Sequence, residues 1–281
     1  MSKPRVAVLM ALYNGENFVH QQINSILKQK GVDVVIFCSI DLSSDNTHRI
    51  ISEYVKEDKR IRILSSEEKF GNPGKNFYRL MLDSNIDNFD YVAFSDQDDI
   101  WLESKLIRAL KMMVKTSSKC YSSGMIAFWP SGQERFIQKK FKQKKYDHFF
   151  ESPGPGCSFV IEKESFLYFK KFLKKNLDSI SKVVSYDWLI YSFFRERNIR
   201  WTIDKESRLM YRQHDNNIVG VNYGLKAIVT RFNKIKNGWY KDECKLISEL
   251  TISASKEKFQ FTRKFLLKNF RNLRRGKNEG I

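Results

Sequence analysis

The sequence predicts an α/β domain in which a mainly parallel sheet is covered by helices on both faces. Over the first hundred residues, short apolar runs alternate with segments in which apolar residues recur at helical spacing. The apolar runs end in polar loops, as the strands of a parallel sheet do at a ligand-binding edge. A chain of 281 residues with 42% hydrophobic content is also large enough to bury a full core.

Seven elements are expected before residue 96. Strands are predicted over 6–12, 34–39, 61–64 and 90–95, and helices over 17–29, 45–56 and 76–82. In the first of these helices Phe18, Ile23, Ile26 and Leu27 share one face. Strands that alternate with helices pair in parallel, because each helix returns the chain to the same end of the sheet.

The pattern is looser after residue 110. Strands are expected over 122–129, 159–162 and 200–203, with helices over 163–176 and 187–197. A tight Pro-Gly-Pro-Gly loop, residues 153–156, leads into the second of these strands.

Composition excludes several classes of protein. An aromatic content of 14% is too high for a disordered chain, and no apolar run approaches the roughly 20 residues needed to span a bilayer. Cys38, Cys120, Cys157 and Cys244 form no C-x-x-C pair, so buried free thiols are expected rather than disulfides or a zinc site. The N-terminus lacks a signal peptide's apolar region, so we expect a cytoplasmic protein.

The net charge of +18 is unevenly distributed. Residues 221–281 carry fifteen Lys and Arg against five Asp and Glu, and residues 139–145 contain five lysines. Such patches attract phosphate-bearing partners, namely an anionic membrane, a lipid-linked diphosphate or nucleic acid.

Three carboxylates follow the strand at 90–95, at Asp96, Asp98 and Asp99. Like charges this close repel each other unless a cation lies among them, and oxygen ligands suit Mg²⁺ or Mn²⁺. A helix N-cap would explain Asp99, for a helix expected to begin near Ile100, but not Asp96 and Asp98. We therefore predict a site for a divalent metal and a diphosphate at this strand end.

Polar side chains also follow the other early strands. The stretch from Ala11 to Glu16 offers Tyr13, which could flank a base, and the Glu16 carboxylate. Asp41 follows the second strand and can accept from a base N–H, while Lys75 can reach a phosphate. Four such loops together predict a nucleotide-sugar site.

With these four loops and two further stretches, the sequence resembles the family 2 inverting glycosyltransferases of the GT-A fold. The matching stretches are 11–16, 41–47, 74–77, residues 94–101 with their Asp-Gln-Asp-Asp-Ile-Trp run, Ser185–Trp188 and the Tyr-Arg-Gln-His run that continues to Asn217. The Asp-Gln-Asp-Asp-Ile-Trp form and the Tyr-Arg-Gln-His run with its Asn ending are most similar to the bacterial rhamnosyltransferase-like branch, which builds surface polysaccharides. Where the family usually has Asp-Asp-Gly, this chain has Ile40-Asp41-Leu42, which affects the expected nucleobase preference.

The resemblance implies a role for each matching residue. Asp187 would be the general base, although a helix N-cap is the alternative for it, and Asp98 with His214 would hold Mn²⁺ or Mg²⁺. His214 could instead be an ordinary loop histidine bonded to backbone. Gly156 and Cys157 would lie on the acceptor side, with Trp101 and Trp188 stacking on sugar rings; core packing is the equal alternative for both tryptophans.

The same resemblance implies a nucleotide-sugar half at 1–110, an acceptor half of the same domain at 111–220 and a basic helical extension at 221–281. The expected reaction moves rhamnose from dTDP-rhamnose, or a hexose from a UDP-hexose, to a lipid-linked glycan acceptor at the inner face of the bacterial membrane. A sugar nucleotidyltransferase and a nucleic-acid-binding protein are the alternatives. A sugar nucleotidyltransferase usually has a Gly-rich phosphate loop near its N-terminus, which this chain lacks. A nucleic-acid-binding protein would not need clustered carboxylates, so nucleic acid is not an expected partner.

A basic amphipathic helix is expected over 256–275, with Phe259, Leu266, Phe270 and Leu273 on one face. This stripe could insert shallowly into an anionic membrane or pack on the catalytic domain. The sequence leaves both possibilities open.

Overall fold

The computed structural model describes residues 2–64, 69–139, 141–214, 237–252 and 262–273. Its first half follows the expected alternation. The elements are β1 (Arg5–Leu12), α1 (Val19–Leu27), β2 (Asp33–Ile40), α2 (Thr47–Glu57), β3 (Ile61–Ile63), α3 (Pro73–Asp83) and β4 (Tyr91–Ser95). Helix α3 begins earlier than expected, because the Asn72 side chain accepts a hydrogen bond from the Lys75 backbone N–H and Pro73 occupies the first turn.

The second half contains shorter strands and longer helices. It comprises β5 (Ile100–Trp101), α4 (Lys105–Thr116), β6 (Cys120–Ser123), β7 (Met125–Phe128), β8 (Glu134–Ile137), β9 (Val160–Glu162), α5 (Lys163–Lys175), α6 (Leu177–Ile180), α7 (Tyr186–Glu196), β10 (Trp201–Asp204), β11 (Leu209–Arg212), α9 (Trp239–Thr251) and α10 (Arg263–Lys268). Three 3₁₀ turns lie at Asp147–Phe149, Gly156–Ser158 and Phe270–Asn272.

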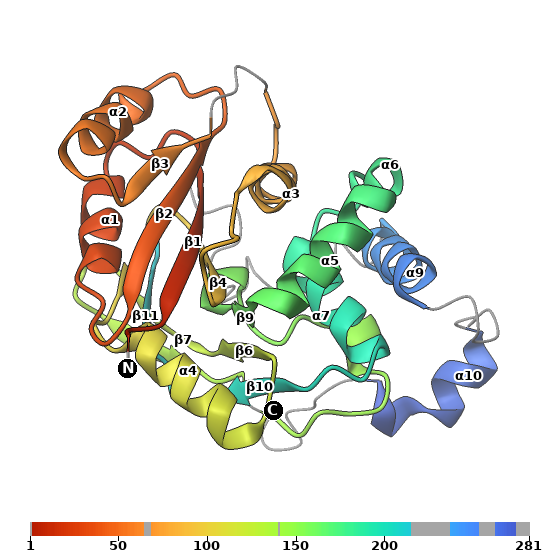
Figure 1. Ribbon diagram of the computed structural model, residues 1–281. Helices are drawn as coiled ribbons and strands as arrows, with labels where there is room; N and C mark the ends of the chain where they lie inside the picture. Colours follow the sequence, from red (N-terminus) through yellow and green to blue (C-terminus); the bar gives the residue numbers. More distant parts are fainter. Residues whose placement is uncertain (1, 65–68, 140, 215–236, 253–261, 274–281) are drawn as a thin grey trace.

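The main sheet has seven strands in the order β10-β6-β9-β4-β1-β2-β3. Strands β1 to β4 pair in parallel, as do β6 and β10, whereas β9 runs antiparallel to both of its neighbours. The predicted α/β class with a mainly parallel mixed sheet is confirmed. Helices α1, α2 and α3 surround the β1–β3 half, and α5 and α7 lie beyond β9 (Figure 1).

A second sheet of four strands, β5-β11-β7-β8, was not expected. The predicted strand over 122–129 divides at Gly124, so that β6 joins the main sheet and β7 joins the second one. A Cβ at Gly124 would lie 2.3 Å from the Ile137 carbonyl oxygen, which explains why a glycine is at this bend.

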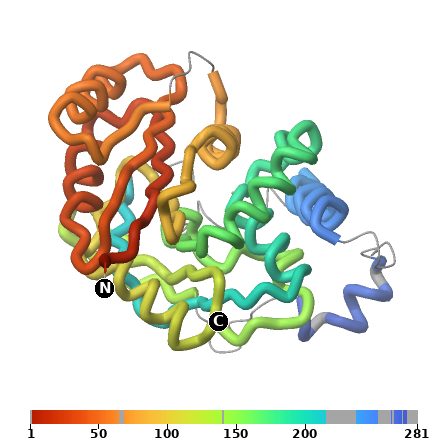
Figure 2. Tube along the Cα trace, in the orientation of Figure 1, coloured from red at the N-terminus to blue at the C-terminus, as the bar shows by residue number. Residues whose placement is uncertain are grey.

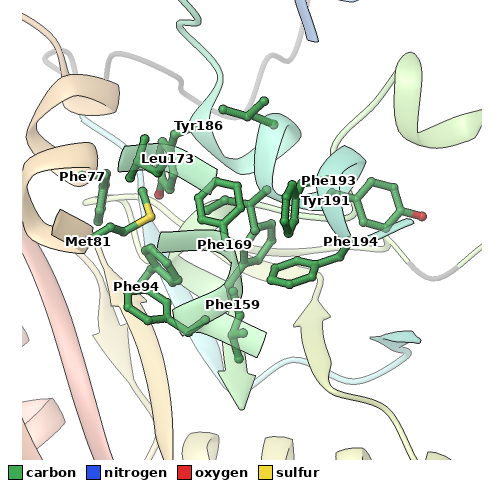
Figure 3. Close-up of a cluster of buried hydrophobic side chains, with 14 of the residues drawn as sticks. Phe77, Met81, Phe94, Phe159, Phe169, Leu173, Tyr186, Tyr191, Phe193 and Phe194 are labelled. Carbon is green, nitrogen blue, oxygen red and sulfur yellow. The ribbon is translucent and has the colours of Figure 1, made fainter. Parts of the chain in front are cut away.

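Alternate residues of the central strands fill the cores on the two faces of the main sheet. In β1, Ala7 and Leu9 contribute to one buried cluster, while Val8 and Met10 contribute to the other. The first cluster, between the sheet and α3, α5 and α7, is rich in aromatic rings. Figure 3 shows Phe77, Phe94, Phe169, Tyr186 and Phe194 among its members.

Two expected helices differ from the structure. No helix begins near Ile100: residues 100–101 form β5, and α4 begins at Lys105. In the tail, α10 covers only 263–268 and is followed by the turn at Phe270–Asn272. Phe259 and the remaining ends of the predicted 256–275 helix lie outside the described residues.

The C-terminal segment packs on the catalytic domain where it is described. Cys244 and Ile247 of α9 are buried in the same core cluster as α7, beside which α9 lies (Figures 1 and 2). Leu266 and Leu273 of the predicted stripe also pack against this cluster. All four cysteines are buried and free, as predicted. Among the described helices, none combines the length and the apolar character required to cross a membrane.

Candidate active site

The ends of three parallel strands converge at one edge of the main sheet. Leu12 of β1 pairs with Ile40 of β2, and Met10 of β1 pairs with Ser95 of β4. The loops that follow these strands therefore emerge side by side. The buried Asn76 amide at the start of α3 donates to the carbonyls of Leu12 (3.3 Å) and Ser39 (3.1 Å), which fixes α3 against the same edge.

The acidic loop after β4 places two partly buried carboxylates at this edge. The pKa of Asp96 is raised to about 7, mainly by burial and then by the charge of Asp98, while the Cys157 side chain lowers it and the charge of Asp187 adds a smaller increase. Asp98 Oδ2 lies 2.9 Å from Nε2 of His214, whose ring stacks on Phe18 at a centroid distance of 4.6 Å. The fold therefore places His214 against Asp98, which is an electrostatic neighbour of Asp96.

Arg212 supports this arrangement from the neighbouring strand. Its Nε donates to the backbone carbonyl of Asp98 (2.8 Å), and its guanidinium lies between the rings of Phe18 and Phe128, 5.0 and 4.7 Å from their centroids. The backbone of the acidic loop is thus held by a cation through the Asp98 carbonyl.

Gln97 links the acidic loop to the loop after β1. Its Oε1 accepts from the Tyr13 backbone N–H (2.8 Å), and its Nε2 donates to the Tyr13 carbonyl (2.7 Å). A Cβ at Gly15 would lie only 2.4 Å from Gln97 Oε1, so the pairing requires glycine there. Tyr13 itself is 50% exposed.

The Asp41 carboxylate is buried and accepts three backbone hydrogen bonds. Its Oδ1 accepts from Leu42 (2.8 Å) and Phe70 (2.8 Å), and its Oδ2 accepts from Gly71 (2.9 Å). Oδ2 retains acceptor capacity, since a carboxylate oxygen can take two hydrogen bonds. The adjacent Leu42 side chain is 63% exposed, an unusual environment for leucine.

The other residues predicted to bind nucleotide also lie at this edge. Glu16 Oε2 accepts from the backbone N–H (3.0 Å) and the side-chain amide (2.9 Å) of Asn46, so it holds the start of α2. Ala11 is partly buried near the end of β1, and the Lys75 side chain is exposed in the first turn of α3.

Asp187 lies in the first turn of α7, one residue after the buried Tyr186. The helix N-cap is Ser185, so the N-cap alternative for Asp187 is wrong. Asp187 Oδ1 accepts from the Trp188 N–H (2.9 Å). Burial raises the pKa of Asp187, and the neighbouring Ser152 side chain and the Trp188 N–H lower it. A carboxylate whose pKa is raised is better suited to accept a proton near neutral pH.

Residues 7–177 match the model of Glycosyl transferase family 2, which is more than half of the chain. The chain belongs to this family.

Relatives of this glycosyltransferase include a rhamnosyl transferase and a glucosyltransferase. It is 46% identical over 235 residues to the dTDP-rhamnosyl transferase RfbG of Shigella flexneri, covering 83% of this chain and 81% of that protein. It is 31% identical over 157 residues to the UDP-Glc:alpha-D-GlcNAc-diphosphoundecaprenol beta-1,3-glucosyltransferase WfgD of Escherichia coli, covering 56% and 59% of the two chains.

The fold of the glycosyltransferase is also found in a solved structure. The structure of S. aureus TarS 1-349 in complex with UDP-GlcNAc superposes with a TM-score of 0.62 at 17% identity, covering 90% of this chain and 68% of that one. At this identity the likeness concerns the fold alone.

Four residues predicted on the acceptor side are buried. Trp101 and Trp188 are 2% and 5% exposed, so in this structure the rings pack in the core rather than offering a face to a sugar. Cys157 is fully buried, and a Cβ at Gly156 would lie 2.0 Å from the Tyr186 hydroxyl oxygen. Contact with Tyr186, rather than close approach of a sugar, accounts for the small residue at 156.

Asp99 was expected to cap a helix, and this expectation is wrong. It is fully buried beneath the acidic loop, and neither carboxyl oxygen has a hydrogen-bond partner among the described residues. Burial first, and then the charges of Asp96 and Asp98, hold its pKa well above the usual range. Lys105, also buried, lies over the Trp101 ring at 3.4 Å from the centroid, and burial lowers its pKa to about 7.

Sequence reasoning missed Gln97 and Arg212 as parts of the site, although both fall inside motifs that carry the resemblance. It also missed a buried polar network behind α7. Arg195 donates to Asp147 (2.9 Å), and His148 bonds to Glu196 (2.9 Å), which holds the 147–150 segment against the helix that carries Asp187. Helical spacing does not reveal which polar residues of a helix, such as Arg195 and Glu196, face another segment.

Proposed function

We propose that this glycosyltransferase transfers rhamnose from dTDP-rhamnose to a hydroxyl of a lipid-linked glycan, with inversion and with a divalent metal. The observation that carries the proposal is the group formed by Asp96, Asp98 and His214 at the carboxyl edge of the sheet, together with Asp187 on a facing helix. The charge of Asp187 contributes to the raised pKa of Asp96, so the two carboxylates are electrostatic neighbours. The family membership decides against a sugar nucleotidyltransferase and against a nucleic-acid-binding protein.

The donor assignment rests on similarity and on the base-side loops. The relative with 46% identity is named for dTDP-rhamnose, whereas the weaker relative is named for UDP-glucose. Asp41 Oδ2 can accept the imide N–H that thymine and uracil share. The exposed Leu42 beside it offers the kind of apolar contact that only the thymine methyl group can use.

The partly exposed pair of Asp98 and His214 fits Mn²⁺ or Mg²⁺ better than the more buried group of Asp96, Asp99 and Cys157 does. Ligand atoms of Asp96, Asp99 and Cys157 lie within 4.8 Å of one another, but burial keeps the pKa of the Cys157 thiol well above its usual range, and a neutral thiol is a poor ligand for a hard cation. Asp98 and His214 are each about 15% exposed and offer oxygen and nitrogen to a donor phosphate. When bound there, the metal would neutralise charge on the leaving diphosphate.

Asp187 acts as the general base in this proposal. The acceptor hydroxyl oxygen forms a bond to C1 of the sugar as the bond from C1 to the diphosphate oxygen breaks, and the hydroxyl proton passes to the Asp187 carboxylate. A single displacement of this kind inverts the configuration at C1. Burial of Asp187, which raises its pKa, favours the proton transfer.

The two basic segments meet in the structure, which supports docking on an anionic membrane. The Tyr146 N–H donates to the Asn272 carbonyl (3.0 Å), and the Tyr146 ring contacts Phe265 edge-on at 5.2 Å. Exposed basic side chains flank this contact from both segments, at Lys142, Lys145, Lys264, Lys268 and Arg271, and Leu267 is 79% exposed. Each such charge near an anionic surface contributes about 1 kcal/mol. Since Leu266 and Leu273 pack on the domain, we propose electrostatic docking in place of deep insertion.

A thermal-shift experiment tests the nucleotide and metal assignments together. We expect dTDP with Mn²⁺ to raise the melting temperature more than UDP or GDP does, and EDTA to remove the effect. Asp98→Asn should lose the Mn²⁺-dependent shift and keep the fold. Equal stabilisation by dTDP in EDTA would show that the metal assignment is wrong.

Turnover of Asp187→Asn tests the base. The variant should retain dTDP binding and lose about 10²–10⁴-fold in transfer rate. Near-normal turnover would rule Asp187 out.

Co-sedimentation with anionic liposomes tests docking. We expect the intact protein to bind phosphatidylserine vesicles at low salt and to release them at high salt. Replacing Lys264, Lys268 and Arg271 by Gln should weaken binding, whereas neutral phosphatidylcholine vesicles should not bind either protein. Unchanged binding by the triple variant would contradict the role of α10.

A further inference from the structure

Helix α9 provides a carboxylate to the start of the helix that carries Asp187. The Glu243 side chain is 4% exposed, and its Oε1 accepts hydrogen bonds from the backbone N–H groups of Val184 (3.0 Å) and Ser185 (2.8 Å). These two residues immediately precede α7. Glu243 thus lies 58 residues beyond Ser185 in the sequence but bonds to it directly.

The start of α7 lacks a local cap. Ser185 is the N-cap residue, yet its side chain makes no capping hydrogen bond. The first N–H groups of a helix have no partner within the helix, and a negative charge near them is favourable. Glu243 supplies both an acceptor and a negative charge at the point where the chain turns toward Asp187.

The same helix also reaches the other side of Asp187. The Tyr240 hydroxyl donates to the Phe150 carbonyl, and the Tyr240 ring lies 5.6 Å from that of Trp188. Phe150 is two residues before Ser152, the side chain that adjoins the Asp187 carboxyl. One helix therefore contacts the segments on both sides of the candidate base. Figure 1 shows α9 running beside α7.

We propose that Glu243 is a positioning residue for this glycosyltransferase: by holding the Val184 and Ser185 backbone, it fixes the first turn of α7 and thereby the direction of the Asp187 carboxylate toward the acceptor hydroxyl. The inference rests on the proposed role of Asp187. It gives α9, which lies outside the family match at 7–177, a part in catalysis.

The contact must be rigid to serve this purpose, and the surrounding packing makes it so. A Cβ at Gly74 would lie 2.8 Å from the Val184 carbonyl oxygen, and the Tyr78 hydroxyl donates to the Val183 carbonyl (3.3 Å). The 183–185 segment is therefore held between α3 and α9. Loss of Glu243 removes the hydrogen bonds to the Val184 and Ser185 N–H groups but leaves the contacts of this segment with α3 in place. The expected defect is therefore a misdirected base rather than an unfolded domain.

Three variants of Glu243 separate positioning from general stability. Glu243→Ala removes the acceptor, and Glu243→Asp withdraws it by one methylene with little loss of packing. Glu243→Gln keeps an oxygen that can accept both N–H groups. The matched control is Glu249→Ala, on the same helix but with a side chain that is 61% exposed.

We expect Glu243→Ala and Glu243→Asp to lower kcat by about 10- to 100-fold, since small displacements of a catalytic group have effects of this size. The Kd for dTDP, measured without turnover, should stay within about twofold, and hydrogen exchange at the Val184 and Ser185 amides should accelerate. Glu243→Gln should keep kcat within about threefold and retain the amide protection. Glu249→Ala should match the wild-type protein in every measurement.

Combination with Asp187→Asn shows whether Glu243 acts through the base. If it does, Glu243→Ala adds little to the loss already caused by Asp187→Asn, because the two changes remove the same interaction. Full additivity, wild-type kcat in Glu243→Ala, or a Glu243→Gln defect as large as that of Glu243→Ala would each overturn the inference. A normal kcat in Asp187→Asn would instead refute the base assignment, and with it the proposal that depends on it.

Discussion

Gly156 provides a test of why the 3₁₀ turn before β9 contains a glycine. A Cβ at this position would lie 2.0 Å from the Tyr186 hydroxyl oxygen, 2.5 Å from Cζ and 2.9 Å from Cε2. Ordinary contacts begin near 3.5 Å, so Gly156→Ala would require the Tyr186 ring to move by more than ~1 Å. The ring stacks on Phe77 at a centroid distance of 4.3 Å and therefore cannot move alone.

Overpacking of this kind costs about 1–3 kcal/mol. For a chain of this size each kcal/mol lowers the melting temperature by roughly 2–4 °C, so we expect a decrease of about 2–12 °C by calorimetry or circular dichroism. Because Tyr186 adjoins Asp187, kcat should fall as well, while dTDP binding persists.

A double-mutant cycle identifies the contact. Combined with Tyr186→Leu, the Gly156→Ala change should cost less than it does alone, because the overlapping atoms are gone. An unchanged melting temperature in Gly156→Ala together with weaker acceptor binding would refute this reasoning. It would favour instead the expectation that the glycine admits a sugar to the backbone.

Three further predictions concern the donor side of the site. Burial raises the pKa of Asp96 from 3.8 to about 7, so the metal-free folded protein holds a proton that the unfolded chain loses, and stability falls as pH rises from about 4 to 7. Asp96→Asn should therefore stabilise the metal-free protein at pH 8, by at most ~4 kcal/mol, and raise its melting temperature in EDTA, but should do neither at pH 4. Equal effects at both pH values would contradict the shift. Gln97→Ala removes both hydrogen bonds to the Tyr13 backbone, each worth about 0.5–1.5 kcal/mol, and should weaken dTDP binding by roughly 5- to 100-fold in calorimetric titrations. Leu42→Gly should reduce the preference for dTDP over UDP, and an unchanged ratio of the two Kd values would remove Leu42 from base recognition.

The sequence was most informative where local pattern and chemistry coincide. Alternation of strand and helix over the first 95 residues predicted the parallel core, because apolar periodicity directly reports which face is buried. The clustered charges of Asp96 and Asp98 predicted a ligand site, since such repulsion is costly without one. The Tyr-Arg-Gln-His stretch placed His214 in the same site, and the structure brings His214 to Asp98 across 116 residues.

The sequence could not decide which residues of one type face solvent and which face another segment. For Trp101 and Trp188 the sequence left two interpretations open, stacking on a sugar ring or packing in the core. Only the structure decides between them, because it shows that both side chains are buried. Asp99 looked like a helix cap, but it precedes the short strand β5, which pairs with β11, and it is fully buried. Strands of two to four residues, such as β5 and β11, carry too few side chains for a periodic signal.

What the sequence by itself determined is the α/β class and the set of chemical groups at the ends of the strands, because both follow from residue type and local spacing. What only the tertiary structure decided is how those groups are supported. Gln97 bonds to the Tyr13 backbone, Arg212 to the Asp98 carbonyl and Glu243 to the start of α7. Each of these bonds joins residues at least 58 positions apart, and each uses a backbone group, which every residue offers alike and which therefore leaves no trace in the sequence.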